Sequence, residues 1–164
     1  MTAVIGARFG PSYRELDMLV AYLVAVWVHV MAAATLVGGM LFFVVVVVPW
    51  TRGLEPPQRT ATLETIGRRF RVVTWASLAL LAATGVFNLW ARGIRPEDVL
   101  RPEWRATTLG HTVVAKVGLA ILLAALCLGH DRVRHRATAK WLGRLALVVI
   151  LVIVAVAIEL VRGV

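Results

Sequence analysis

MLVAYLVAVWVHVMAAATLVGGMLFFVVVVVP, residues 18–49, contains no Asp, Glu, Lys or Arg. A bilayer core needs about 20 helical residues. An apolar run of this length therefore predicts a transmembrane helix that tilts or extends beyond the membrane. Valine is common in the run, and in water it would favour a β-strand. In lipid, however, a single segment can satisfy its own backbone hydrogen bonds only as a helix.

Three further apolar runs follow, at about residues 72–91, 108–129 and 142–160. The four runs predict an all-α integral membrane protein, a four-transmembrane-helix bundle in which residues 1–164 form a single domain. The composition agrees, because 60% of the residues are apolar, whereas a soluble domain is nearer half apolar. In residues 57–71 the apolar side chains are spaced three and four apart, which predicts a short helix lying on the membrane surface.

The net charge of +9 resembles that of a nucleic-acid-binding protein, but the basic residues lie between the apolar runs and not in one stripe. This distribution favours the lipid bilayer, and no nucleic acid, as the partner. Ten basic residues lie in residues 51–71 and 130–144, against seven in the N-terminal arm, residues 92–107 and the C-terminus. The positive-inside rule then predicts that both termini lie outside the cytoplasm.

Ionisable and polar residues inside the spans are candidates for a functional site, because such groups are costly in hydrocarbon. With both termini outside, five of them fall in the outer half of the bundle: His29, Asn88, His111, Lys116 and Glu159. We expect His29 and Lys116 to face the interior at similar depth. Each residue also has an ordinary explanation. Asn88 and Glu159 could simply be solvated near the membrane surface, and His111 could lie at the interface. Lys116 could extend its side chain toward the surface.

Met18, His29 and Met40 are spaced eleven and eleven residues apart. Eleven residues turn a helix by three turns plus about 20°, so the three side chains share one stripe. Thioether and imidazole groups suit copper. The stripe could therefore hold successive copper stations, although methionine is also an ordinary filler of gaps in a core.

A basic rim is expected at the inner ends of the helices. Its arginines should set the topology and contact lipid phosphate. They are Arg69, Arg71, Arg132, Arg134 and Arg136, with His130 and His135 beside them.

Several motifs occur together between residues 27 and 131. They are His29 ahead of Gly38-Gly39, Arg69-Phe70-Arg71, Thr84-Gly85, and Gly110 six residues before Lys116. In order and spacing this segment resembles the CopD copper-resistance membrane domain. More distantly it resembles HemJ, the membrane protoporphyrinogen oxidase that carries haem b.

The CopD resemblance implies a copper-binding protein of the bacterial cytoplasmic (inner) membrane, involved in copper uptake or handling and supplied by a periplasmic copper donor. His29 matches the first-helix histidine of both families, and Lys116 matches the third-helix lysine. Two departures stand out. Leu36 replaces the tryptophan expected seven residues after His29, and the HemJ histidine shortly after the lysine has no counterpart at matching spacing.

The HemJ resemblance implies the alternative, a haem b protein acting in electron transfer or porphyrinogen oxidation with an electron-transfer partner. His29 would be an axial ligand, His111 a second one, and Lys116 would lie near the haem. A third alternative is a non-catalytic subunit of a membrane complex. In each case a homo-oligomer is compatible with the sequence.

Overall fold

The structure, a computed structural model, describes residues 13–133 and 136–162, with the side chains of residues 13–133 and 138–158. All regular elements in this part are helices, which confirms the all-α expectation. They are α1 (Tyr13–Phe42), the π-helix η1 (Phe43–Val47), α2 (Val48–Trp50), the 3₁₀-helix η2 (Thr51–Gly53), α3 (Pro56–Ala91), α4 (Pro96–Leu100), α5 (Pro102–Arg105), α6 (Thr108–Arg132) and α7 (Arg136–Arg162).

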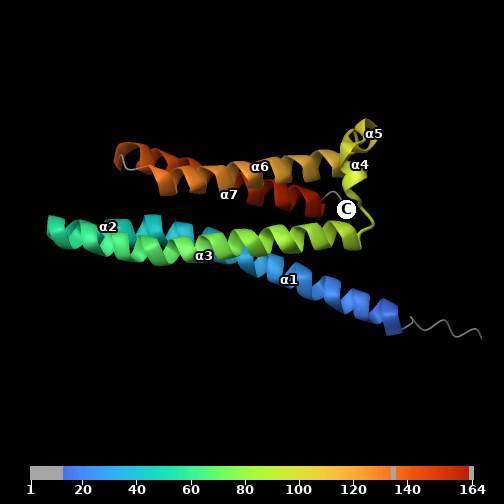
Figure 1. The fold of residues 1–164 in the computed structure, drawn as a ribbon, viewed down its shortest axis with the longest axis horizontal. Coiled ribbons are helices and arrows are strands. Elements are labelled where there is room, and N and C mark those ends of the chain that lie inside the picture. The colour runs from blue at the N-terminus through green and yellow to red at the C-terminus, as the bar shows by residue number, and fades with distance from the viewer. Residues whose placement is uncertain (1–12, 134–135, 163–164) are drawn as a thin grey trace, which may run out of the picture.

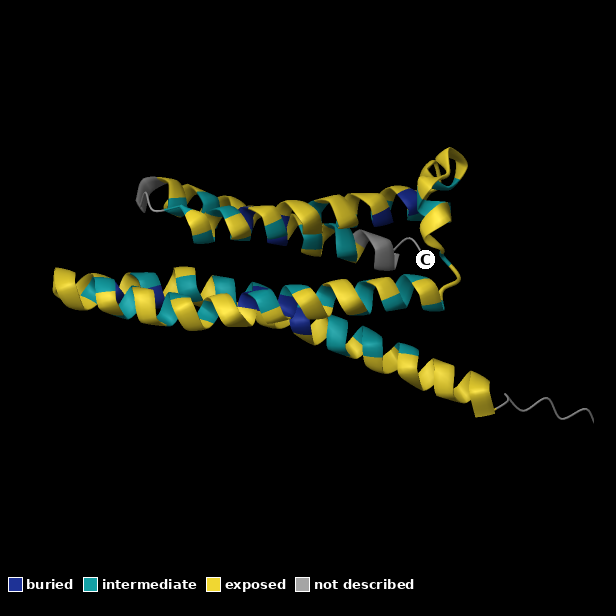
Figure 2. Ribbon diagram, in the orientation of Figure 1, coloured by how far each residue is buried: buried dark blue, intermediate teal, exposed yellow. Residues whose placement is uncertain are grey.

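Four helical segments of the described chain are long and apolar enough to cross a membrane. They are Tyr13–Gly53, Pro56–Ala91, Thr108–Arg132 and Thr138–Ile158. At most 17% of the residues in any of their apolar windows are buried inside the protein, and most of the helical surface is exposed (Figure 2). An apolar surface of this extent needs lipid to cover it, so the protein is a multi-pass membrane protein.

The helices form two antiparallel pairs, with α1 packed along α3 and α6 along α7 (Figure 1). The turn at η2, the end of α6 and the start of α7 lie together at one end, here called the turn end. The start of α1, the connection through α4 and α5, and the C-terminal end of α7 lie at the opposite end, the termini end. Toward the termini end α1 diverges from the other helices (Figure 1).

The first span changes from α- to π-helix just before a proline. Pro49 has no N–H to donate to the carbonyl of Val45, and its ring would collide with that carbonyl in a regular α-helix. The wider π turn at Phe43–Val47 accommodates the proline, and the chain then closes through η2. Thr51 is fully buried in this turn, and its hydroxyl donates to the carbonyl of Val48 at 2.9 Å.

The expectation of a separate surface helix over residues 57–71 is wrong, because α3 runs without interruption from Pro56 to Ala91. No proline or other break separates the two parts, so the helix continues into the span. Phe70 holds the first part in place by stacking on Phe43, with ring centroids 5.9 Å apart. The apolar spacing therefore packs this segment against the first span and not against the membrane surface.

The buried core joins the two helix pairs. Leu36 of α1, only 1% exposed, contacts Leu123 and Leu126 of α6 and a cluster on α7. The α7 residues of that cluster are Ala146, Val149 and Ile150. This core fixes the depth at which polar residues of α1, α3 and α6 meet.

Candidate functional site

His29 is half-buried on α1 and is held by Thr84 of α3, with 2.8 Å between Nδ1 and Oγ1. The single hydroxyl proton of Thr84 is donated to the carbonyl of Leu80, 2.6 Å away. The Thr84 oxygen must therefore accept the Nδ1–H of His29. In the neutral ring this leaves Nε2 with its lone pair free, as in a histidine oriented to bind a metal.

His29 and Thr84 belong to a longer row of polar residues between α1 and α3. Thr84, Asn88 and Arg92 are spaced four apart on α3, and Tyr22 and His29 are spaced seven apart on α1. Both spacings place side chains on one helix face. We call these five residues the polar seam.

Arg92 occupies the termini end of the seam, at the C-cap of α3. Its Nε and Nη2 donate to the Tyr22 hydroxyl at 3.1 and 3.0 Å, and its guanidinium lies 6.0 Å from the centre of the Tyr22 ring. The two hydrogen-bonded pairs, His29–Thr84 and Tyr22–Arg92, therefore lie about 11 Å apart along the helices.

Asn88 lies between these two pairs, and its Oδ1 is buried without a hydrogen-bond partner among the described residues. A buried polar atom left unpaired costs about 1–3 kcal/mol. Native proteins contain few such atoms, and they call for an explanation such as a bound group. Asn88 thus marks an incomplete place in the seam.

Lys116 reaches the seam from α6. It is half-buried and lies close enough to both His29 and Arg92 for electrostatic interaction. Among the described side chains, neither Lys116 nor Arg92 forms an ion pair with a carboxylate. Lys116 therefore places a positive charge inside a span, where charge is costly, and Arg92 adds a second positive charge at the exposed end of the seam. A ligand with carboxylate groups would pair with both.

The structure does not bring the other predicted ligands to the seam. His111 is exposed, and its side chain forms no hydrogen bond or ion pair with any described residue. It precedes Lys116 by five residues, which places it about 140° around the helix. Met18 is 44% exposed, and Met40 packs against the buried core. The Glu159 side chain lies outside the described part of the chain.

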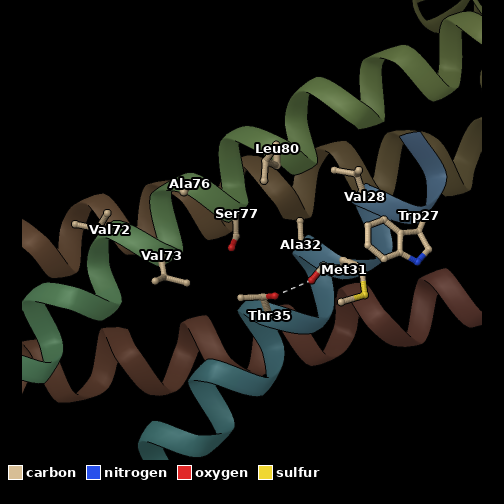
Figure 3. Close-up of a pocket in the computed structure, with 10 residues that line it drawn as sticks. All are labelled: Trp27, Val28, Met31, Ala32, Thr35, Val72, Val73, Ala76, Ser77 and Leu80. Atoms are coloured by element: carbon tan, nitrogen blue, oxygen red, sulfur yellow. Dashed lines mark hydrogen bonds between the residues drawn. The ribbon is translucent and has the colours of Figure 1, made fainter. Parts of the chain in front are cut away.

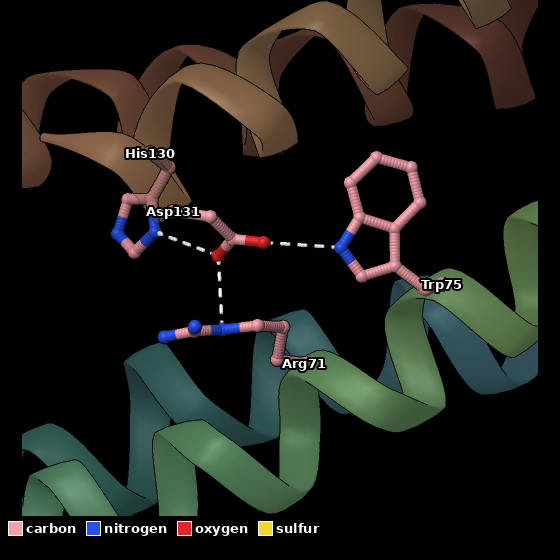
Figure 4. Close-up of polar contacts among 4 residues, drawn as sticks. All are labelled: Arg71, Trp75, His130 and Asp131. Carbon is pink, nitrogen blue, oxygen red and sulfur yellow. Dashed lines mark hydrogen bonds and ion pairs between the residues drawn. The ribbon is translucent and has the colours of Figure 1, made fainter.

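A second polar cluster lies at the turn end, and its central residue, Asp131, is not among the residues that the sequence predicted. Trp75 Nε1 donates to Asp131 Oδ2 at 3.0 Å, and Arg71 Nε lies 3.0 Å from Oδ1 (Figure 4). His130 Nδ1 lies 4.0 Å from the same Oδ1. We call these four residues the Asp131 clamp, because they tie α3 to α6. Of the two predicted α3 rim arginines, Arg71 thus has a structural partner, whereas Arg69 is exposed.

An apolar groove of about 350 Å³ lies between α1 and α3. In Figure 3, Ser77 points into it from α3, and Thr35 on the α1 side donates its hydroxyl to the carbonyl of Met31 at 2.8 Å. None of the seam residues lines this groove. Its walls are almost entirely apolar, as suits a surface covered by lipid chains.

Three members of the seam, namely Tyr22, Thr84 and Arg92, are also absent from the residues that the sequence predicted. A signal for two of them is present, since Thr84, Asn88 and Arg92 repeat every four residues in an otherwise apolar helix. Tyr22 gives no such signal, and only its pairing with Arg92 across the helices shows that the two belong together.

No family model matches this chain, and no solved structure matches it. It is 30% identical over 149 residues to an uncharacterized protein of Aquifex aeolicus (strain VF5). The alignment covers 84% of this chain and 93% of the Aquifex protein. Because the alignment covers nearly the whole Aquifex protein at this identity, this four-helix membrane protein belongs to the family of that protein.

Proposed function

We propose that this protein is a haem b-binding membrane protein in which His29 would hold the haem iron. The observation that carries the proposal is the His29–Thr84 hydrogen bond, which leaves Nε2 of a half-buried histidine free to bind a metal. A bound haem would supply one-electron transfer between partners at the membrane. The resemblance to HemJ supports the same cofactor.

The charges around His29 favour haem over a bare copper ion. Lys116 would repel a metal cation at His29, because like charges in a low-dielectric interior interact strongly, whereas water and salt screen the charge of the exposed Arg92. Haem brings two carboxylates, which pair well with lysine and arginine. Lys116 and Arg92 would hold those carboxylates, while Asn88 offers a further polar contact.

The copper stations stay a prediction, but the donor atoms do not gather around His29. Met18 and Met40 are each about 16 Å from His29 along the helix axis. Among the described residues, no group of three His, Cys, Asp or Glu side chains could hold a metal ion together. A copper site at the seam would therefore have to rely on His29 with few other donors.

The test is the absorption spectrum of the full chain purified in detergent, together with its iron and copper content. We expect a Soret band with a reducible α-band in the wild type, and its loss in His29→Ala. His111→Ala is the matched control, because it removes the same side chain from an exposed site on the same bundle. Loss of haem in both variants would instead make His111 the second ligand.

Full haem occupancy in His29→Ala would refute the proposal. Stoichiometric copper without a Soret band would establish that the protein binds copper. The absence of both haem and copper would favour a non-catalytic subunit. Lys116→Met should weaken haem retention while the helical circular dichroism stays unchanged, because it removes a carboxylate partner and keeps an apolar stem. Unchanged retention would leave Lys116 out of the site.

We also propose a bacterial cytoplasmic membrane and termini that face away from the cytoplasm. The basic residues concentrate at the turn end, which the positive-inside rule places in the cytoplasm. Fusions of alkaline phosphatase and of a fluorescent protein to the C-terminus test this. We expect only the phosphatase fusion to be active, and the opposite result would reverse the orientation.

A further inference from the structure

The outward surface of α7 carries a groove of about 310 Å³ at the turn end, away from the polar seam. It is lined by Thr138, Trp141, Leu142, Arg144, Leu145 and Val148. From Thr138 to Val148 it extends about 15 Å along the helix. Thr138 and Trp141 lie toward the turn end, Arg144 lies about one turn deeper, and Leu145 and Val148 lie deepest in the span.

Arg144 and Trp141 form the polar end of this groove. The guanidinium carbon of Arg144 lies 5.2 Å from the centre of the Trp141 ring, within the range of a cation–π contact. Trp141 is 67% exposed, so the pair faces the surroundings of the protein. Stacking limits the motion of the guanidinium but leaves its N–H groups available for an anion.

We propose that this groove is a binding site for one anionic phospholipid. The lipid phosphate would bind Arg144, whose forked N–H groups suit phosphate oxygens. Trp141 would lie at headgroup level, where tryptophan is enriched in membrane proteins. Leu145 and Val148, both exposed, would contact the upper part of an acyl chain.

Charge complementarity selects an anionic lipid over a zwitterionic one. Lys140 is exposed and precedes Arg144 by four residues, so both cations lie on the same side of α7. Basic residues near a membrane surface attract anionic lipids. A zwitterionic headgroup carries a compensating positive charge that these residues would repel.

The test is native mass spectrometry of the full chain, released from detergent after exposure to equal amounts of phosphatidylglycerol or phosphatidylcholine. We expect the wild type to retain phosphatidylglycerol preferentially. Arg144→Gln should lower that retention roughly tenfold, as for the loss of one charge-assisted phosphate contact. Trp141→Leu should lower it less, because the charge remains.

Arg52→Gln is the matched control, since Arg52 is an exposed arginine of η2 at the same end. Equal losses in Arg52→Gln and Arg144→Gln would overturn the site in favour of diffuse attraction by the whole basic end. Equal retention of the two lipids by the wild type would also overturn it. Inorganic phosphate in excess should not displace the lipid, and displacement would show that the acyl contacts contribute nothing.

Discussion

The two ends of the α1–α3 helix pair are built differently. At the turn end, Gly39 lets Phe70 pack directly against the α1 backbone, and the Asp131 clamp satisfies its carboxylate with three partners. At the termini end, α1 diverges, and the seam keeps an unpaired amide oxygen at Asn88. One end is closed by its own side chains, and the other is incomplete.

The difference shows where stability and function reside. Tight packing and satisfied polar groups hold helices together but leave nothing for a ligand to bind. A row of polar groups with unmatched positive charge weakens the bundle, and proteins accept such local violations mainly at functional sites. The turn end therefore acts as the scaffold, and the polar seam is where a cofactor is expected.

The largest stability effect should come from the clamp. Asp131→Ala removes the acceptor of the Trp75 N–H and the partner of Arg71, and it should lower the free energy of unfolding by about 2–3 kcal/mol. Unfolding in mixed detergent micelles, driven by sodium dodecyl sulfate, measures this. Haem content per folded molecule should stay at the wild-type level.

The control for this variant is Glu97→Ala at the termini end, where the exposed carboxylate pairs with the exposed Arg95 at 3.6 Å. Exposed pairs contribute about 0–1 kcal/mol. If both variants were equally stable, the clamp would be no stronger than a surface pair and the contrast between the ends would fail.

The number of transmembrane helices and their order could be predicted from the sequence, because four apolar runs leave the chain no other way to satisfy its backbone in lipid. The beginning of α3 at Pro56 could not. Apolar spacing in residues 57–71 shows that a face is buried, but it does not show whether lipid or Phe43 covers that face. Only the three-dimensional packing decides between these two.

The candidate site could be predicted in part. His29, Asn88 and Lys116 stand out because polar residues are rare within apolar runs. Thr84 is marked only by its four-residue repeat with Asn88 and Arg92. Tyr22 does not stand out, because tyrosine is an ordinary residue of membrane helices and acquires a role only through a contact 70 residues away. His111 and Lys116 are predicted together because both fall in the predicted outer half of the bundle, but their side chains leave α6 in different directions.

Glycine substitutions compare the packing of the two ends directly. A Cβ on Gly39 would lie 2.6 Å from Cε2 of Phe70, whereas a Cβ on Gly85 would lie 3.6 Å from Cε1 of His29. Gly39→Ala should therefore destabilise the protein by about 1–2 kcal/mol through overpacking. Gly85→Ala should be tolerated, because its contact is an ordinary van der Waals distance. Both are measured by the same micelle titration.

Gly38→Ala provides the matched control beside Gly39, since a Cβ on Gly38 would meet nothing within 4 Å beyond its chain neighbours and the adjacent turns of its own helix backbone. Alanine favours a helix over glycine by about 1 kcal/mol in water, so this variant should be neutral or slightly stabilising. Equal destabilisation by Gly38→Ala and Gly39→Ala would mean that the Phe70 contact does not limit the packing.

A smaller stability effect is expected for Thr84→Val, which keeps the shape of the side chain and removes the hydroxyl. Hydrogen bonds between membrane helices average about 0.6 kcal/mol in double-mutant cycles. The cofactor should respond more, because His29 loses the group that orients its ring. A changed Soret position with nearly unchanged stability is the expected result, and Thr84→Ser should preserve the wild-type spectrum.

The smallest effect is expected for Tyr22→Phe at the open end of the seam. This variant keeps the ring under the Arg92 guanidinium but removes the hydroxyl that accepts from Nε and Nη2. Arg92 is exposed, so water can replace the lost acceptor, and the free energy of unfolding should fall by no more than about 0.5 kcal/mol.

If Arg92 holds a haem carboxylate, the guanidinium freed in Tyr22→Phe should retain haem at least as well as in the wild type, whereas Arg92→Gln should lose part of the haem. Weaker retention in Tyr22→Phe would show that Tyr22 positions Arg92 for the ligand. Destabilisation as large as that of Asp131→Ala would show that the termini end is a second clamp, and it would remove the contrast between the two ends.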